Sequence, residues 1–500
     1  MNVRRNLVAN LLGQGWAALL NIAAVPIYLR LLGVESFGLL GLAIVVLVLA
    51  SLLDGGMGQT LNRAMVHFHV GKVGRHETFD LLRSIEASIF GVALVASAGA
   101  FLAGPALASW LIDARGLPDF VVERSLLLIV IVALLRVIEG IYRSALLGLD
   151  RPILVNVLSA VSATVRIVAP LPVIVFAKGD VLTYFWLQLV IGLASLICFG
   201  TITHVVLEGT LFGKGHFRII LLRKLLGFAG AAVAISSLVS VANQLDKIAA
   251  ARLTTLEDFG YYSAAATVAT GIYQLVLPTF QSFYPKLSYL QAIEAQPEFD
   301  RLVLRMAQLV GFIAGVPIAV IVLNADEVVF AWTGSPAVAE LTAPLLFWLC
   351  FGTLANGLFY VALAALLAAG RHKVAVVTTT VLLVALLPLL LLGWNIAGLI
   401  GLAAAWSSAM GCWCLVTLVL TARAITGARI LLPLLAHSVA PFLIALLVGA
   451  VIRYIVQHDM RGQLVEILFT IVTAIAVGLL TAISLWSIER LRQSRGGAFE

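Results

Sequence analysis

The chain consists almost entirely of apolar runs that are long enough to cross a membrane. Stretches of about 20 apolar residues, the length of helix that spans a ~30 Å hydrocarbon core, recur from end to end of the 500 residues. Hydrophobic residues make up 62% of the chain and charged residues only 11%, whereas soluble globular proteins carry about 25% charged residues. We therefore expect an all-α integral membrane protein with about 14 transmembrane helices. Among the expected spans are 374–394, 396–422 and, as the last, 464–488, and the stretch 59–83 is expected to be a polar connection.

The sequence also repeats itself at an offset of 222 residues. The motif Arg-Leu-x3-Glu-x-Phe-Gly occurs at 30–38 and again at 252–260, each time at the edge of a long apolar run. Membrane proteins with two parallel halves are typically transporters whose substrate binds between the halves, near the bilayer midplane. We expect two parallel-related six-helix lobes plus two C-terminal helices. The predicted parts are an N-lobe (1–206), a basic cytoplasmic linker (207–224), a C-lobe (225–422), and an accessory helix pair with a cytoplasmic tail (423–500).

The distribution of basic residues predicts the orientation of the chain. With the N-terminus in the cytoplasm, Lys and Arg in the connections on the inner side far outnumber those on the outer side, as the positive-inside rule requires. Both termini are therefore expected in the cytoplasm. The net charge of +7 then reflects topology, and we expect no nucleic-acid partner. No P-loop, zinc motif or CxxC pair occurs, so we expect no cofactor, no metal and no catalytic residue.

Ionisable residues inside apolar spans are candidates for function because they are costly in the bilayer. Arg166 lies close to the middle of the predicted span 153–176. It requires a wet cavity, an acidic partner or an anionic ligand. In the predicted span 125–147, Arg136, Glu139 and Arg143 follow the i, i+3, i+7 spacing of one helical face. Two interpretations of that face remain open: an internal ion-pair network, or contact with a ligand.

The second half carries its own polar break, within the predicted span 225–249. Asp246 and Lys247 are adjacent there, and adjacent helical residues point about 100° apart. We therefore do not expect them to pair with each other. Asp246 is instead a candidate to neutralise a cation from a neighbouring helix or to bind a coupling ion. Asp54, which precedes a glycine-rich turn, is expected to be a cap or a gate.

Together these residues predict a cavity that is richer in cations than in anions. Such a cavity, with long apolar walls, suits an amphiphile with an anionic head, because arginine binds phosphate through two hydrogen bonds at once. Each proline within the spans frees a backbone carbonyl and permits a kink. Prolines are also simply frequent in membrane helices, so only the pair Pro170-x-Pro172 is singled out as a candidate helix break. The candidate substrate-binding cations are Arg30, Arg136, Arg143, Arg166, Lys247 and Arg252. The coupling or gating candidates are Asp246, Glu139 and Asp54, and the polar cavity candidates are Asn10, Gln14, Asn21, Asn243 and Gln244.

Several loose motifs, in order along the chain, resemble the polysaccharide transport family. This family holds the O-antigen and exopolysaccharide flippases of the multidrug/oligosaccharidyl-lipid/polysaccharide exporter superfamily. The motifs are Asn10-x3-Gln14, Pro26-x-Tyr28-x-Arg30-x2-Gly33, Phe37-Gly38, Gln244-x-Asp246, Phe259-Gly260-x-Tyr262-Ser263, Tyr284-Pro285-x-Leu287-Ser288 and Gly398-x2-Gly401-x2-Ala404. The resemblance extends over nearly the whole chain, including the number of spans.

The resemblance implies a flippase in the bacterial inner membrane. Its substrate would be an undecaprenyl-diphosphate-linked oligosaccharide, carried to the periplasmic leaflet by alternating access and with ion coupling. Membrane lipid, a glycan polymerase and a chain-length regulator are the partners it implies. The alternatives are a lipid II flippase, which shares the span count and a cationic cavity, and a cation-coupled multidrug antiporter, for which twelve spans and buried carboxylates are expected. An enzyme of glycan assembly is disfavoured because the outer connections are short.

Overall fold

A computed structural model of the chain describes residues 3–177, 179–207, 215–218, 233–455 and 477–478. The elements formed by these residues are helices, and none of the described elements is a β-strand. Eight helices in these ranges are long and apolar enough to cross a membrane. They are Val34–Asp54, Arg75–Leu111, Pro152–Ala177, Val181–Val206, Gln296–Leu323, Pro336–Ala368, His372–Ile425 and Leu431–Tyr454. The all-α membrane fold is thereby confirmed.

Two segments differ from the spans expected from the sequence. The polar stretch 59–83 is mostly helical, because α3 (Met57–His69) buries Leu61 and Met65 and α4 (Arg75–Leu111) begins before the apolar run. The expected spans 374–394 and 396–422 both lie in α15 (His372–Thr421), whose backbone breaks at Ala397–Gly398. The expected last span, 464–488, lies outside the described residues except for 477–478.

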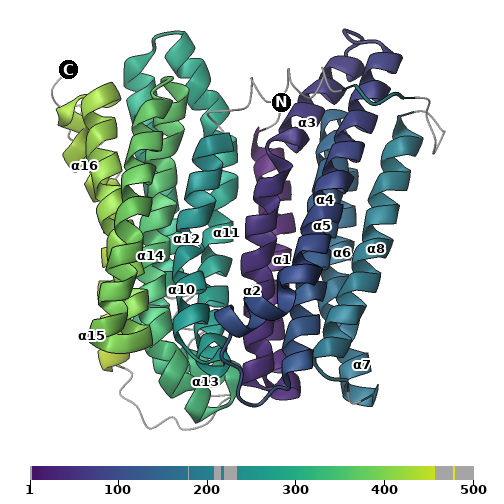
Figure 1. The fold of residues 1–500 in the computed structure, drawn as a ribbon. Helices are drawn as coiled ribbons and strands as arrows, with labels where there is room; N and C mark the ends of the chain where they lie inside the picture. Colours follow the sequence, from purple (N-terminus) through teal and green to yellow (C-terminus); the bar gives the residue numbers. More distant parts are fainter. Residues whose placement is uncertain (1–2, 178, 208–214, 219–232, 456–476, 479–500) are drawn as a thin grey trace, which may run out of the picture. The chain divides into compact units, whose positions relative to one another are not determined.

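The described chain forms two compact units, one of residues 27–263 and one of residues 1–26 with 264–500. The first, the 27–263 unit, contains most of the blue helices of Figure 1. Its helices are α2 (Val34–Ser51), α3, α4, α5 (Asp119–Gly148), α6 (Pro152–Val168), α7 (Pro170–Ala177), α8 (Val181–Val206) and α10 (Leu245–Leu253). Helices α1 (Val3–Leu32) and α11 (Leu256–Ala292) cross the boundary between the units. The lobe boundaries expected from the repeat stay a prediction.

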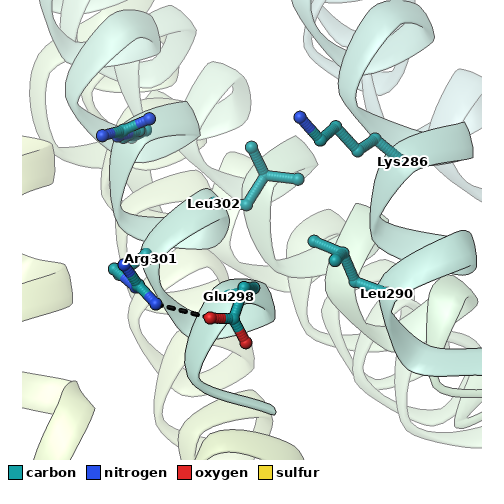
Figure 2. Close-up of a pocket in the computed structure, with 6 residues that line it drawn as sticks. Lys286, Leu290, Glu298, Arg301 and Leu302 are labelled. Carbon is teal, nitrogen blue, oxygen red and sulfur yellow. Dashed lines mark hydrogen bonds and ion pairs between the residues drawn. The ribbon is translucent and has the colours of Figure 1, made fainter. Parts of the chain in front are cut away.

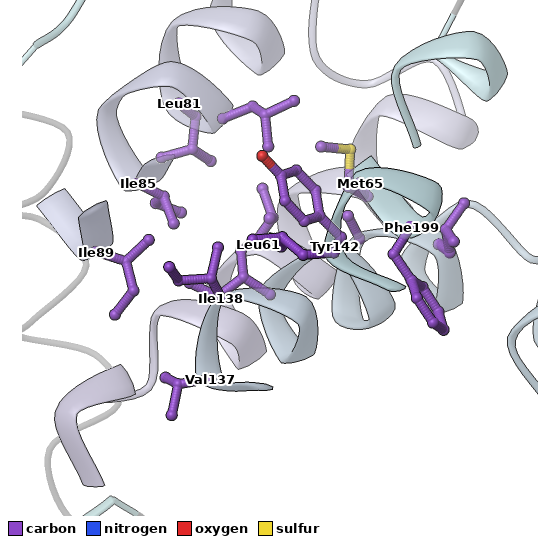
Figure 3. Close-up of a cluster of buried hydrophobic side chains, with 14 of the residues drawn as sticks. Leu61, Met65, Leu81, Ile85, Ile89, Val137, Ile138, Tyr142 and Phe199 are labelled. Atoms are coloured by element: carbon purple, nitrogen blue, oxygen red, sulfur yellow. The ribbon is translucent and has the colours of Figure 1, made fainter. Parts of the chain in front are cut away.

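An apolar cluster holds α3, α4, α5 and α8 of the 27–263 unit together (Figure 3). Leu61 of α3, Ile85 of α4, Ile138 of α5 and Phe199 of α8 are at most 3% exposed within it. Helices α3 and α5 cross closely at Gly148, where a Cβ would collide with the Asn62 carbonyl. This core fixes α5 and α8, which carry most of the site described below.

The two copies of the repeat contact each other through reciprocal glycines. A Cβ on Gly38, in α2, would collide with the carbonyl of Leu256, and a Cβ on Gly260, in α11, would collide with the carbonyl of Val34. These two contacts exchange under the offset of 222 residues, because Val34 corresponds to Leu256 and Gly38 to Gly260. Only glycine permits the backbones to approach this closely.

A third contact lies between the residues that correspond to each other directly. A Cβ on Gly41 would collide with the side chain of Ser263, and Ser263 is the repeat equivalent of Gly41. A residue can contact its own equivalent only near the axis that relates the two copies. The start of α2 and the start of α11 therefore meet around a local pseudo-twofold axis.

The other unit is built on α12 (Gln296–Leu323), α13 (Ala325–Thr333), α14 (Pro336–Ala368), α15 and α16 (Leu431–Ile455). Gly311 and Gly315 of α12 lie against the Ser438 carbonyl and the Phe442 side chain of α16. This Gly-x3-Gly spacing lets two membrane helices pack at short range. Trp332 of α13 donates a hydrogen bond from its indole nitrogen to the Ile22 carbonyl of α1 at 3.0 Å.

Candidate functional site: a guanidinium cluster around Glu139

The site is built at the helix break between α6 and α7. Pro170 has no N–H to donate to the carbonyl of Arg166, four residues earlier. The side-chain amide of Gln188, on α8, donates to that carbonyl at 2.7 Å instead. The Tyr28 hydroxyl donates to the next carbonyl, of Ile167, at 2.7 Å. The interruption expected at this proline pair is present in the helical hydrogen bonding, although φ and ψ of Ala169 stay helical. Neighbouring side chains satisfy the backbone carbonyls that it frees.

Arg166 lies in the last turn of α6, directly before this break, and is only 5% exposed. Its Nη2 donates to Glu139 Oε2 at 2.7 Å, and its Nε donates to Ser162 Oγ at 3.2 Å. Of the three surroundings that the sequence allowed for this arginine, the structure contains the acidic partner. That partner lies 27 residues away in the sequence, on α5.

Glu139 is the centre of a network that joins α5, α6 and α8. Its Oε1 accepts from Arg143 Nη2 at 3.0 Å, one helical turn further along α5. Its Oε2 also accepts from Ser195 Oγ of α8 at 2.9 Å, and Ser195 Oγ lies 3.0 Å from Ser162 Oγ. The ion-pair interpretation of the charged face of α5 is therefore correct as far as Glu139, Arg143 and Arg166 are concerned.

Two guanidinium groups pair with the carboxylate of Glu139, and a third lies near it. Arg136, the third, is exposed and lies within electrostatic range of Glu139, Arg143 and Arg166. It makes no hydrogen bond or ion pair with the residues that the structure describes. The buried Nη1 of Arg166 and the buried Nε of Arg143 also have no hydrogen-bond partner there. Excess positive charge with unused donors is an arrangement that binds anions, since guanidinium donors pair with phosphate oxygens.

Gly192 of α8 lies beside the buried Nη1 of Arg166. A Cβ at this position would lie 3.6 Å from Arg166 Nη1 and 3.5 Å from the Leu135 side chain. Any side chain longer than a methyl group would compete for the space next to Nη1. The glycine thus lets α8 pass beside this buried nitrogen without a longer side chain against it.

Asp246, at the start of α10, is another buried carboxylate and is 0% exposed. Both of its oxygens lie 3.1 Å from Lys247 Nζ, and the Tyr262 hydroxyl of α11 donates to Oδ2 at 2.6 Å. The expectation that these adjacent residues would not pair is wrong. The lysine side chain is long and flexible, so its amine folds back to reach both Asp246 and the Asn243 carbonyl at 3.0 Å.

The remaining candidates lie away from the Glu139 network. Asp54 Oδ1 accepts from the backbone N–H of Gly58 at 2.9 Å, which is the capping role expected for it. The Arg252 guanidinium stacks over the Trp110 ring, 5.2 Å from its centroid. Arg30 and Asn21 are exposed on α1, and Gln244 is buried before α10. Asn10 and Gln14 lie on α1, but their side chains are outside the described part of the structure.

A third buried polar group was not anticipated from the sequence. Glu86 Oε1 accepts from the Tyr142 hydroxyl at 2.8 Å and lies 3.1 Å from His204 Nε2, while Oε2 pairs with Arg83 at 2.7 Å. Glu86 and His204 are both 6% exposed. The sequence does contain one signal for this group, because Glu86 and His204 each fall a few positions inside an apolar run. No group of three or more His, Cys, Asp or Glu in the described ranges could hold a metal ion.

Comparison with known proteins assigns the family. A family model described as polysaccharide biosynthesis protein matches residues 3–291, which is more than half of the chain. The chain belongs to the polysaccharide biosynthesis protein family. No curated protein matches the chain significantly.

Solved structures similar to this polysaccharide biosynthesis protein are transporters of one superfamily. The lipid II flippase MurJ, in an inward closed conformation, has a TM-score of 0.71 and 15% identity, over 97% of this chain and 99% of its own. An inward-facing multidrug resistance MATE transporter of the MOP superfamily has a TM-score of 0.71 and 13% identity, over 82% and 94%.

A MOP superfamily transporter from Pyrococcus furiosus, described by the reverse polarity of its binding pocket, has a TM-score of 0.61 and 12% identity, over 86% and 97%. At these identities the likeness of all three structures shows the fold, which is that of a multi-pass membrane transporter.

Proposed function

We propose that this protein is a flippase that moves an undecaprenyl-diphosphate-linked oligosaccharide, an O-antigen or exopolysaccharide repeat unit, across the bacterial inner membrane. The observation that carries the proposal is the guanidinium cluster, in which Arg136, Arg143 and Arg166 surround the single carboxylate of Glu139. Membership of a polysaccharide biosynthesis family and the fold of a lipid II flippase support it.

In this proposal the diphosphate binds to donors that the protein itself does not use. Arg136 offers an exposed guanidinium, while Arg166 Nη1 and Arg143 Nε are buried without a partner among the described residues. Glu139 holds two of the guanidiniums in place, so their orientation is set before the ligand arrives. Such preorganisation lowers the entropic cost of binding. Arg30, Lys247 and Arg252 take a secondary role, because Lys247 is engaged by Asp246 and Arg252 by Trp110.

Of the three candidates for coupling to an ion, we prefer Asp246 to Glu139 and Asp54. The cationic partner of Asp246 is the neighbouring Lys247. The lysine side chain is flexible, so its amine can move away from the carboxylate without movement of a helix. Removal of that amine would leave a fully buried carboxylate, with Tyr262 as its remaining partner among the described residues, for a proton or a metal cation. Glu139 is instead held by two arginines and a serine on three helices.

Export of a hydrophobic cation is the alternative function in the same superfamily. A cationic ligand requires carboxylates or an aromatic cage, whereas the cluster around Glu139 has three guanidiniums and one carboxylate. A lipid II flippase remains the second candidate, because lipid II presents the same diphosphate to the site. The two flippases differ in the sugar and not in the group that the arginines would bind.

The test is analysis of lipid-linked oligosaccharides in the native host after depletion of the protein. We expect undecaprenyl-diphosphate-linked units to accumulate in the cytoplasmic leaflet, and the accumulated glycan identifies the substrate. Complementation with Arg136→Gln/Arg143→Gln is expected to fail. Arg151→Gln, which removes an exposed arginine at the start of α6, should complement. Normal lipid pools combined with altered sensitivity to cationic drugs would favour the antiporter instead.

A further inference from the structure

A basic pocket lies between α11 and α12 in the unit of residues 1–26 and 264–500. Its volume is about 330 Å³, and it is lined by Lys286 and Leu290 of α11 and by Glu298, Arg301, Leu302 and Arg305 of α12. Figure 2 shows Lys286 extending from one helix toward the other, with the Arg301–Glu298 pair on the facing helix. The volume is within the range of small-ligand sites, about 300–1,000 Å³.

Two of the three cations of this pocket form no hydrogen bond or ion pair with the described residues. Arg301 donates to Glu298 at 2.6 Å and to the Pro297 carbonyl at 3.2 Å. Lys286 and Arg305 are exposed and form no hydrogen bond or ion pair within the described ranges. Arg305 follows Arg301 by one helical turn, so both lie on the face of α12 that lines the pocket. The pocket therefore presents two uncompensated positive charges.

Besides its three cations and Glu298, the pocket is lined by two leucines, and the neighbouring residues indicate the depth of lipid headgroups. Leu290 is buried and Leu302 half-buried at the pocket. Tyr289, beside Leu290 on α11, is 62% exposed, and exposed tyrosines concentrate where membrane and water meet. Lys286 is seven residues from the turn at 293–295, which is roughly 10 Å along a helix. The positive-inside rule assigns this end of α11 and α12 to the cytoplasmic face.

We propose that this pocket binds the phosphate headgroup of an anionic phospholipid from the cytoplasmic leaflet. The phosphodiester oxygens contact Lys286 Nζ and the Arg305 guanidinium, and the glycerol and first acyl carbons lie along Leu290 and Leu302. Basic pockets between membrane helices on the cytoplasmic side bind such headgroups. A zwitterionic lipid brings its own cation toward the two charges, and a free phosphate leaves the apolar half of the pocket unfilled. The proposal does not depend on the transported substrate.

The experiment compares lipid binding by the full-length protein and by matched variants in detergent. Lys286→Gln/Arg305→Gln removes the two free cations. Arg371→Gln/Lys373→Gln removes one Arg and one Lys that are equally exposed, at the start of α15 in the same unit. Thermal unfolding is followed with added phosphatidylglycerol, phosphatidylcholine or inorganic phosphate, and retained lipids are counted by native mass spectrometry.

We expect phosphatidylglycerol to raise the melting temperature of the wild type and of the Arg371/Lys373 control, whereas phosphatidylcholine and inorganic phosphate do not. The Lys286/Arg305 variant should retain one phosphatidylglycerol fewer and bind this lipid at least about tenfold more weakly. Lys286→Arg/Arg305→Lys, which keeps both charges, should restore binding. An equal effect of phosphatidylglycerol on all variants, or an equal effect of phosphatidylcholine, would refute the proposal. A full stabilisation by inorganic phosphate alone would show a phosphate site and no lipid site.

Discussion

Two of the buried carboxylates of the 27–263 unit, Glu139 and Asp246, are stabilised in opposite ways. Glu139 accepts from two arginines and a serine that come from α5, α6 and α8. Asp246 is neutralised by its own neighbour in the sequence, Lys247, and accepts one further bond from Tyr262. The first group has cations in excess, whereas the second is balanced. We infer that the Glu139 group is arranged for an external anion and that the Asp246 group is complete in itself until Lys247 leaves.

Among the substitutions, Arg166→Ala in the Glu139 group is expected to have the largest effect on export. Loss of this guanidinium removes both a proposed ligand contact and the charged partner of Glu139 Oε2, so export should be abolished. Breaking a buried pair costs about 3–5 kcal/mol of stability, and the remaining Arg143 limits that loss. Transport should be measured in proteoliposomes at matched amounts of inserted protein.

The double variant Arg166→Gln/Glu139→Gln separates the two effects of that substitution. It removes the buried charge together with its counter-charge, so the melting temperature should recover part of the loss while export stays absent. Recovery of export in this variant would exclude Arg166 from the substrate site.

Asp246→Asn tests the proposed role of Asp246 in ion coupling. The amide can still accept from Tyr262, but it no longer neutralises Lys247 or holds an ion. We expect export to lose most of its dependence on an ion gradient, while substrate binding in equilibrium dialysis changes less than about threefold. Asp54→Asn, at a capping carboxylate, is the control and should leave the ion dependence unchanged. An unaltered gradient dependence in Asp246→Asn would exclude the coupling role.

Arg136→Gln is expected to have an intermediate effect that is confined to function. The side chain is exposed and has no partner among the described residues, so the free energy of unfolding should change by less than about 0.5 kcal/mol. Substrate affinity should fall on the order of tenfold, because charge-assisted hydrogen bonds contribute about 1.5–3 kcal/mol. Isothermal titration with the lipid-linked substrate measures this, and an unchanged affinity would limit the site to the buried arginines.

The smallest effect is expected from Gly192→Ala. The added methyl group fits without a clash, 3.6 Å from Arg166 Nη1, and alanine is the better helix former by about 1 kcal/mol. The melting temperature should therefore stay equal or rise, while export slows severalfold because Nη1 is partly covered. A variant that exports at the wild-type rate would show that the ligand does not reach this nitrogen.

Local sequence patterns predicted some of this site and long-range contacts decided the rest. Pro170 predicted the break after α6, and the spacing of Arg136, Glu139 and Arg143 predicted one charged face, since both follow from helix geometry. The pairing of Arg166 with Glu139 required α5 and α6 to be placed against each other, so the sequence could only name an acidic partner as one possibility.

Two features could not be predicted from backbone spacing alone. The Asp246–Lys247 pair depends on the rotamers of a flexible side chain and not on the 100° between helical neighbours. The Glu86, His204 and Tyr142 group joins three helices that are far apart in the sequence, and no local pattern links these residues.

The reciprocal contacts of Gly38 and Gly260 also restrict the order in which the protein can be made. Synthesis proceeds from the N-terminus, so α2 enters the bilayer long before the residues around Leu256 and Gly260 exist. Until they emerge from the ribosome, the glycine face at the start of α2 has no backbone to pack against. The first copy of the repeat must therefore be held in the membrane in an unfinished form, and its completion depends on the synthesis of the second copy.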